Sequence, residues 1–176
     1  MLMTRRDNIG GLLHDRAFDC YREKIPRTIR DTISFIDQLG IRCLWVDALC
    51  IIQDDAESKH DQIRAMAGIY ANSYVTVIAG NGWDADHGLR GFQGVTKERN
   101  LSSFSKSDIN EISQPFSSIW YTRGWTFQEM VFSPRKIVFQ YQLALWECSE
   151  NAWHESSLST NYSMLNASRL QPSINP

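Results

Sequence analysis

Apolar side chains recur at helical spacing in the first quarter of the chain. Three isoleucines fall on one stripe: Ile29, Ile33 and Ile36. Pro26 stands at a first-turn position before this stripe, and Gly40 follows it as a stop. These signals predict a helix of about three turns whose isoleucine stripe packs in the core.

Two apolar runs predict strands. The first, over residues 43–48, is apolar enough to be buried on both faces and carries one carboxylate, Asp47, near its end. The second covers residues 74–79. Between them, residues 58–71 predict an amphipathic helix with apolar positions at i, i+3, i+4 and i+7: Ile63, Met66, Ala67 and Tyr70.

This alternation of helix and strand predicts an α/β fold with an open, mainly parallel sheet and flanking helices. We expect residues 44–47 and 75–78 to be its central strands. We also expect Ile33, Ile36, Ile63, Met66 and Tyr70 in the core.

The pattern changes after residue 79. Residues 80–118 are mostly small and polar, which predicts a long irregular insertion of the kind that is usually functional or mobile. A helix over about residues 122–132 follows, and then a C-terminal β-hairpin from residues 136–140 and 143–148. Serine and asparagine dominate residues 149–176, so we expect a single domain of residues 1–148 and a poorly ordered tail.

Candidate chemistry gathers in the segment from Arg123 to Met130. Trp125, Gln128 and Glu129 stand at offsets of three and four, which brings them onto one helix face. We take four residues as candidate ligand-binding positions: Trp125, Gln128, Arg123 and Gln53. Glu129 and Asp47 are the candidate catalytic acids.

Several segments carry a family resemblance, in this order: Ile25-Pro26-Arg27-Thr28-Ile29-Arg30-Asp31, Leu39-Gly40-Ile41-Arg42, Leu44 to Asp55, Met66 with Ile69-Tyr70-Ala71-Asn72, Gly88-Leu89, Arg123 to Glu129, Ser133-Pro134-Arg135 and Trp146-Glu147-Cys148. In order and spacing they resemble the heterokaryon incompatibility (HET) domain of filamentous fungi, from about Thr4 to Cys148. The resemblance implies a part in fungal self/non-self recognition, a form of innate immunity, and in programmed cell death. It also implies action through self-association or protein partners.

A more remote resemblance joins Trp125 and Glu129 to the Toll/interleukin-receptor (TIR) helix segment of pattern S-x-W-C-x-x-E-L. It implies a TIR-like or flavodoxin-like sheet. It also implies an NAD-cleaving glycohydrolase, in which NAD is a substrate, no cofactor is needed and Glu129 is the acid. In such a cleavage one carboxylate stabilises the positive charge of an oxocarbenium-like state while tryptophan faces stack on the base.

Both acids have structural alternatives. Glu129 could be a surface residue of a helix or a carboxylate bonded to a backbone amide. Asp47 stands near the carboxyl end of a predicted strand, where ligands bind in open α/β sheets. It could instead cap the following turn or pair with an arginine such as Arg42 or Arg123. Gln53-Asp54-Asp55 resembles a helix start, and a metal site there is the weaker reading.

The HET family usually opens with a strand that ends in a motif like L-S-Y-x-W-G, and nothing before Thr4 matches it. We therefore expect the first family strand to be missing. Its loss would leave an open apolar slot and unpaired backbone groups, each costing ~1 to 3 kcal/mol. An inactive, truncated gene product remains an alternative.

Composition narrows the remaining classes. With 18 lysine and arginine residues against 20 aspartate and glutamate residues, no basic face for nucleic acid is indicated. No apolar run reaches the roughly 20 residues of a membrane span, and no signal peptide is visible, so we expect a cytoplasmic protein. The four cysteines lack zinc-site spacing and are expected to be plain buried thiols, with no metal bound.

Overall fold

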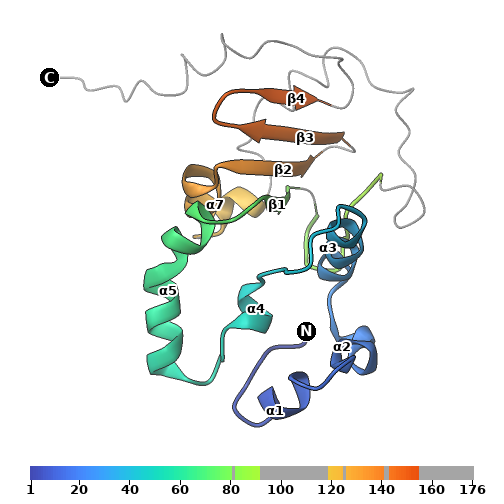
Figure 1. Ribbon diagram of the computed structural model, residues 1–176, viewed down its shortest axis with the longest axis vertical. Coiled ribbons are helices and arrows are strands. Elements are labelled where there is room, and N and C mark those ends of the chain that lie inside the picture. Colours follow the sequence, from blue (N-terminus) through green and yellow to red (C-terminus); the bar gives the residue numbers. More distant parts are fainter. Residues whose placement is uncertain (81, 92–118, 125, 141–142, 155–176) are drawn as a thin grey trace, which may run out of the picture.

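The computed structural model describes residues 1–80, 82–91, 119–124, 126–140 and 143–154 (Figure 1). Its helices are α1 (Ile9–Leu12), α2 (Ala17–Cys20), η1 (Arg22–Lys24), α3 (Arg27–Gln38), α4 (Asp47–Cys50), α5 (Ala56–Ala71), η4 (Ile119–Thr122) and α7 (Thr126–Phe132). Its strands are β1 (Thr76–Ala79), β2 (Arg135–Gln140), β3 (Leu143–Cys148) and β4 (Ala152–His154). The prediction of an α/β fold with an open sheet and flanking helices is confirmed.

The sheet has the order β1-β2-β3-β4. β1 pairs in parallel with β2, with Thr76 opposite Lys136, whereas the β2–β3 and β3–β4 pairs are antiparallel. The expectation of a mainly parallel sheet is therefore wrong for the described strands. The cause is the short connections between the last three strands, because tight turns can join only antiparallel neighbours. β1 is an edge strand of this sheet and not a central one.

The predicted strand over residues 43–48 does not form. Residues 41–46 have no regular structure, and Asp47–Cys50 form the short helix α4. None of the described strands pairs with this segment, so its apolar residues have no ladder to join. Asp47 is exposed and not buried. Three cysteines expected to be buried are exposed as well: Cys20, Cys43 and Cys50.

Helix α3 agrees with the prediction in its bounds and in the burial of Ile36, but not in the burial of Ile33. Gly40 ends it with φ of 70°. The buried residues are Asp31, Thr32, Phe35 and Ile36. Ile33 is 37% exposed, because the sheet lies against the Phe35–Ile36 side of the helix and Ile33 points elsewhere.

The core forms where α3 meets the sheet. Phe35 packs edge-on against Phe139 of β2, with ring centroids 5.4 Å apart, and Ile36 and Leu89 complete the buried cluster. Leu89 is fixed there because its backbone N–H donates to Asp31 Oδ2 at 3.0 Å. Gly88 has φ of 80°, and a Cβ on it would lie 2.5 Å from Asp31 Oδ2, so the close approach requires glycine.

Of the predicted insertion over residues 80–118, the structure describes residues 80 and 82–91, which form neither helix nor strand. The other residues of the insertion lie outside the described part, as do residues 155–176 of the predicted tail. Ala152–His154, which we placed in that tail, instead add β4 to the sheet through pairing with β3. The predicted hairpin is confirmed as β2 and β3. The boundary at residue 148 stays a prediction.

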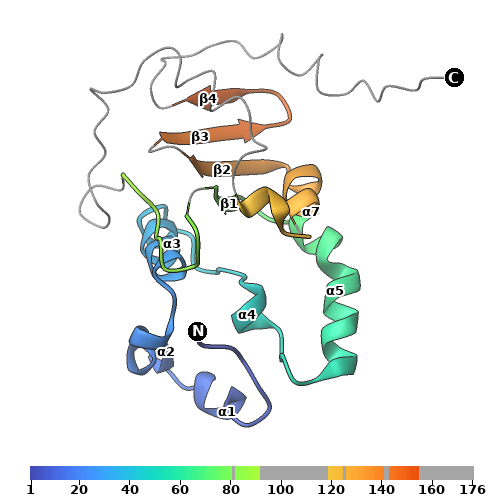
Figure 2. The ribbon, with the colours of Figure 1, turned by 180° about the vertical axis from the view of Figure 1, so that it is seen from behind.

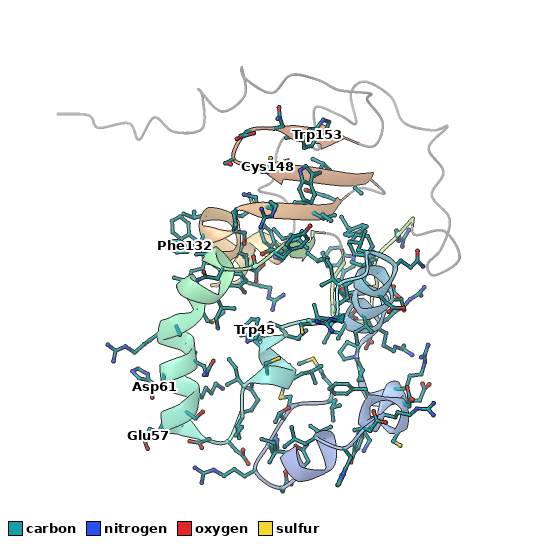
Figure 3. All side chains as sticks on the ribbon, viewed as in Figure 1. Trp45, Glu57, Asp61, Phe132, Cys148 and Trp153 are labelled. Carbon is teal, nitrogen blue, oxygen red and sulfur yellow. The ribbon has the colours of Figure 1, made fainter. Side chains whose placement is uncertain are left out.

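Helix α5 begins with Asp55, whose Oδ1 accepts a hydrogen bond from the Ser58 backbone N–H at 3.2 Å, as the helix-start signal predicted. Met66 and Tyr70 are buried and Ile63 is partly buried. Figure 3 shows Glu57 and Asp61 on the outer side of this helix and Trp45 in the middle of the molecule. Across the described residues, no helix has the length and apolar character needed to cross a membrane.

Met66→Ala is expected to lower the free energy of unfolding by about 2 to 5 kcal/mol, because Met66 is only 2% exposed and its loss leaves a cavity. Urea denaturation followed by circular dichroism measures this. Leu39→Ala is the control, since Leu39 is 50% exposed at the end of α3. Equal effects of the two variants would contradict the assignment of Met66 to the core.

Candidate functional site

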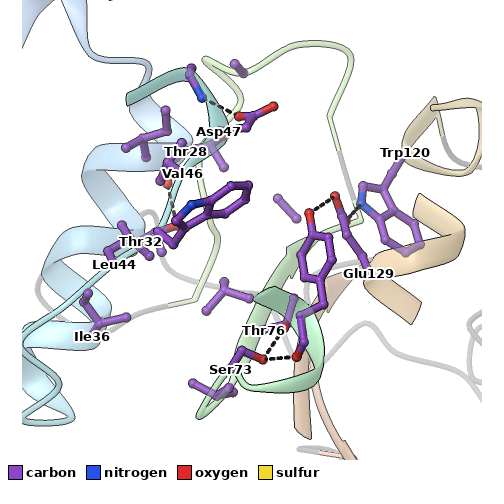
Figure 4. Close-up of a pocket in the computed structure, with 18 of the residues that line it drawn as sticks. Thr28, Thr32, Ile36, Leu44, Val46, Asp47, Ser73, Thr76, Trp120 and Glu129 are labelled. Carbon is purple, nitrogen blue, oxygen red and sulfur yellow. Dashed lines mark hydrogen bonds between the residues drawn. The ribbon is translucent and has the colours of Figure 1, made fainter. Parts of the chain in front are cut away.

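A cleft of about 680 Å³ opens below β1 (Figure 4). In Figures 1 and 2, α3 and α5 stand on opposite sides of the molecule with α4 between them. Residues of α3, of the 41–48 segment, of α5 and of β1 line the cleft, together with part of the 82–85 loop. Most of its lining is apolar, including Ile29, Ile36, Leu44, Val46, Met66 and Ile69.

Glu129 of α7 forms two side-chain hydrogen bonds in the wall of the cleft. Its Oε2 accepts a hydrogen bond from Trp120 Nε1 at 2.8 Å, and its Oε1 accepts one from Tyr70 Oη at 3.3 Å. The ring of Trp45 meets Tyr70 edge-on, with centroids 6.2 Å apart. One carboxylate therefore joins α5, η4 and α7, and both of its donors belong to aromatic side chains (Figure 4).

The charges at this end of the cleft act on Tyr70. Burial raises the pKa of the Tyr70 phenol, and the negative charge of Glu129, its hydrogen bond and the charge of Asp47 raise it further. Arg123 opposes this shift of the pKa. Asp47, Glu129 and Arg123 thus share one electrostatic environment, although they come from separate parts of the sequence.

Hydroxyl groups position the helices around this cluster. Thr76 Oγ1 of β1 lies 2.7 Å from Ser133 Oγ and 3.0 Å from Ser73 Oγ, which donates to the Tyr70 carbonyl. The buried Thr126 hydroxyl donates to the Trp120 carbonyl at the start of α7. These bonds fix where α5 ends and where α7 begins, and so where Tyr70 and Glu129 meet.

The structure brings three of the six predicted site residues to the cleft: Glu129, Asp47 and Arg123. Gln53 has a local contact instead, because its Nε2 donates to the Asp47 carbonyl at 2.9 Å and closes α4. Gln128 is not among the described lining residues. Its Oε1 is buried and has no hydrogen-bond partner in the described part of the chain. Trp125 lies outside the described residues.

Tyr70 and Trp120 were not predicted as site residues. The helical spacing of Tyr70 predicts a core position, and its separation of 59 positions from Glu129 gives no signal that the two side chains meet. The hydrogen-bond donors to Glu129 can be identified only from the structure, because η4 brings the Trp120 indole N–H to the carboxylate.

The described residues contain no cluster of side chains that could bind a metal ion. Nowhere in those residues do three or more His, Cys, Asp or Glu side chains come together in a way that could hold an ion. Asp55, which we had weighed as a ligand, caps α5 and forms an ion pair with Arg6 at 3.1 Å. Hydrogen bonds from the Ser58 backbone and from Arg6 lower the pKa of Asp55, which favours its charged form.

The family model described as Heterokaryon incompatibility protein (HET) matches residues 11–129, more than half of the chain. The chain belongs to the HET family. The match runs through α3, the 41–48 segment, α5 and β1, and it ends at Glu129, so it contains nearly the whole lining of the cleft. No curated protein and no solved structure matches the chain significantly.

Tyr70→Phe is expected to lower the free energy of unfolding by about 0.5 to 1.5 kcal/mol at neutral pH, through loss of the bond to Glu129. Because the folded-state pKa of Tyr70 lies above its ordinary value of 10.0, the wild-type protein loses stability as the pH rises through that value. The variant has no phenol to titrate, so its deficit should shrink at alkaline pH.

Urea denaturation between about pH 8 and pH 11 measures this difference. Tyr74→Phe is the control, because Tyr74 is 70% exposed and its hydroxyl has little to lose. If the loss of unfolding free energy in Tyr70→Phe stays constant with pH, the raised pKa of Tyr70 would be contradicted.

Proposed function

We propose that this HET domain acts in self/non-self recognition and signals toward programmed cell death through contacts with protein partners or with further copies of itself. Membership of the HET family supports heterokaryon incompatibility as the setting. The observation that carries the mode of action is the inverted polarity of α7.

Helix α7 turns polar side chains inward and apolar ones outward. Thr126 is 4% exposed and Glu129 is bonded in the cleft wall, whereas Phe127 is 69% and Val131 56% exposed. Phe127 and Val131 are four residues apart and share one face, and Phe132 follows at 41% exposure, pointing away from the molecule (Figure 3). We call these three residues the α7 apolar row.

An ordinary surface helix has the opposite arrangement, with its apolar stripe toward the core. Burying one large apolar side chain stabilises an assembly by about 1.5 to 3 kcal/mol. The α7 apolar row therefore supplies a strong driving force for association, and exposed apolar patches of this kind mark protein contacts. Partners and further copies of the chain both fit this surface.

The double variant Phe127→Ser and Val131→Ser is expected to reduce self-association or partner capture and to reduce toxicity on overexpression in a fungal cell. Light scattering after size-exclusion chromatography and a growth assay measure these effects. Leu13→Ser is the matched control, because Leu13 is 80% exposed but lies near α1. Unchanged assembly and unchanged toxicity of the double variant would contradict the role of the α7 apolar row.

A second candidate function is NAD cleavage, which the polar end of the cleft favours. Glu129 is held in a fixed orientation by two donors, Tyr70 and Trp120, with Trp45 and Arg123 in the same lining. In this scheme the bond between nicotinamide and ribose breaks, the Glu129 carboxylate stabilises the positive charge on the sugar, and water then adds. NAD would be the substrate, and no cofactor is involved.

Glu129→Gln separates the two functions. If NAD cleavage operates, loss of the negative charge should slow nicotinamide release about 10²- to 10³-fold and abolish toxicity. If the domain acts through protein contacts, as we favour, the wild-type protein releases no nicotinamide and the variant remains toxic. Nicotinamide release from purified protein and growth of the expressing cells give the two readouts.

Glu57→Gln is the matched control, because Glu57 is exposed at the outer side of α5. Circular dichroism is needed beside it, since glutamine at position 129 can accept only one of the two donated hydrogen bonds through its single carbonyl oxygen. Leaving one buried donor unmet costs about 1 to 3 kcal/mol. Nicotinamide release by the wild type that disappears in the folded variant would overturn the contact function as the whole account.

A further inference from the structure

One edge of β1 has no described strand beside it. The Gly80 N–H donates to the Phe139 carbonyl at 2.9 Å, so residue 80 directs its backbone groups toward β2. The backbone N–H and C=O groups of successive strand residues point to opposite edges. Those of Thr76 and Ile78 therefore point toward β2, and those of Val77 and Ala79 point away from it. No described strand pairs with that second edge, and it borders the cleft.

The opposite wall of the cleft is also extended chain. Residues 41–46 run without regular structure, and Val46 has φ of −137° and ψ of 123°, which are strand values. Among the described residues, the backbone groups of residues 43–45 form no hydrogen bond with other backbone groups. The cleft therefore lies between two stretches of backbone that both have donors and acceptors to offer.

The other two sides of the cleft are apolar. Ile29 and Ile36 of α3 line it, as do Met66 and Ile69 of α5. A strand placed between these helices would be covered on both faces, as in the interior of an α/β sheet, where strands are apolar throughout.

The charged side chains that line the cleft indicate which charge a ligand should carry. Among the described side chains that line the cleft, three are carboxylates, Asp47, Asp84 and Glu129, and one is a cation, Arg123. Asp47, Glu129 and Arg123 lie at the same end, since all three act on Tyr70, so two carboxylates there face one cation. A ligand with a basic group at that end complements this excess of negative charge.

We propose that the cleft binds an extended, apolar segment of a partner protein as an added β-strand, with a basic residue toward Asp47 and Glu129. Backbone amides and carbonyls at a free edge are matched by another backbone, which is how strand addition recognises a peptide. A second copy of this chain fits the cleft poorly. Its β1 is paired with its β2, so β2 would have to enter the cleft together with β1. The inference deepens the proposed function by naming one partner chemistry, and its test uses neither toxicity nor the α7 apolar row.

The probe is the blocked peptide Lys-Thr-Val-Ala-Val-Thr-Lys, titrated into the full chain by calorimetry. Its twin carries N-methyl groups on alternate residues, which keeps the side chains and removes backbone donors. Amide exchange by nuclear magnetic resonance should show the Val77 and Ala79 amides slowing when the peptide binds. The Ile78 amide, which faces β2, is the internal reference. We expect the methylated twin to bind at least about tenfold more weakly, as loss of two or three hydrogen bonds implies.

Val77→Pro gives an independent arm. Proline is tolerated on an edge strand where its missing N–H faced outward, so the variant should fold by circular dichroism and lose peptide binding. Val77→Ala keeps the N–H, so the loss of binding by Val77→Pro beyond that of Val77→Ala measures the contribution of the backbone N–H. The inference is overturned by equal binding of the methylated twin, by binding without protection of Val77 and Ala79, or by no binding at all. Protection of those amides in the free protein through dimer formation would overturn it too.

Discussion

The parallel pairing of β1 with β2 satisfies only one edge of β1, and much of the molecule follows from this constraint. Phe35 and Ile36 of α3 pack against Phe139 of β2, so α3 is held at one side of the sheet. Contacts with α7 hold α5 at the other. The 41–46 segment must cross between these helices without a neighbouring strand, and the cleft is the space that remains.

The same constraint explains why an apolar sequence failed to become a strand. An isolated extended segment gains no ladder hydrogen bonds, so Asp47–Cys50 turn into a short helix that satisfies its backbone locally. The Gln53 amide assists by donating to the Asp47 and Ile51 carbonyls, at 2.9 Å and 3.1 Å. The position of Asp47 at the rim of the cleft therefore follows from the need to satisfy backbone hydrogen bonds as much as from its own charge.

Local patterns predicted the elements whose stability is local. The bounds of α3 and α5, the Asp55 cap and the β2–β3 hairpin all depend on residues within a few positions of one another, and the sequence carries those signals directly. The prediction for the buried face of α3 was right for Ile36 and wrong for Ile33, because isoleucine spacing is compatible with two neighbouring stripes. Only the position of Phe139 selects the one with Phe35 and Ile36.

The candidate site shows the same division. Glu129, Asp47 and Arg123 could be singled out as residue types, and they do line one cleft. Their partners could not, because Tyr70 reaches Glu129 across 59 residues of sequence and Trp120 reaches it only through η4. The inverted polarity of α7 was hidden for a related reason. Periodicity reports which residues share a face, and packing alone decides which face turns inward.

Glu129 also connects the two surfaces to which function is assigned. Its carboxylate forms part of the cleft wall, while Phe127 and Val131 of the same helix face outward. A segment that fills the cleft must pack beside Tyr70 and Trp120, and any shift of those rings either carries α7 with it or breaks the hydrogen bonds to Glu129. The cleft wall and the α7 apolar row therefore share one short helix, and Glu129 ties that helix to Tyr70 and Trp120.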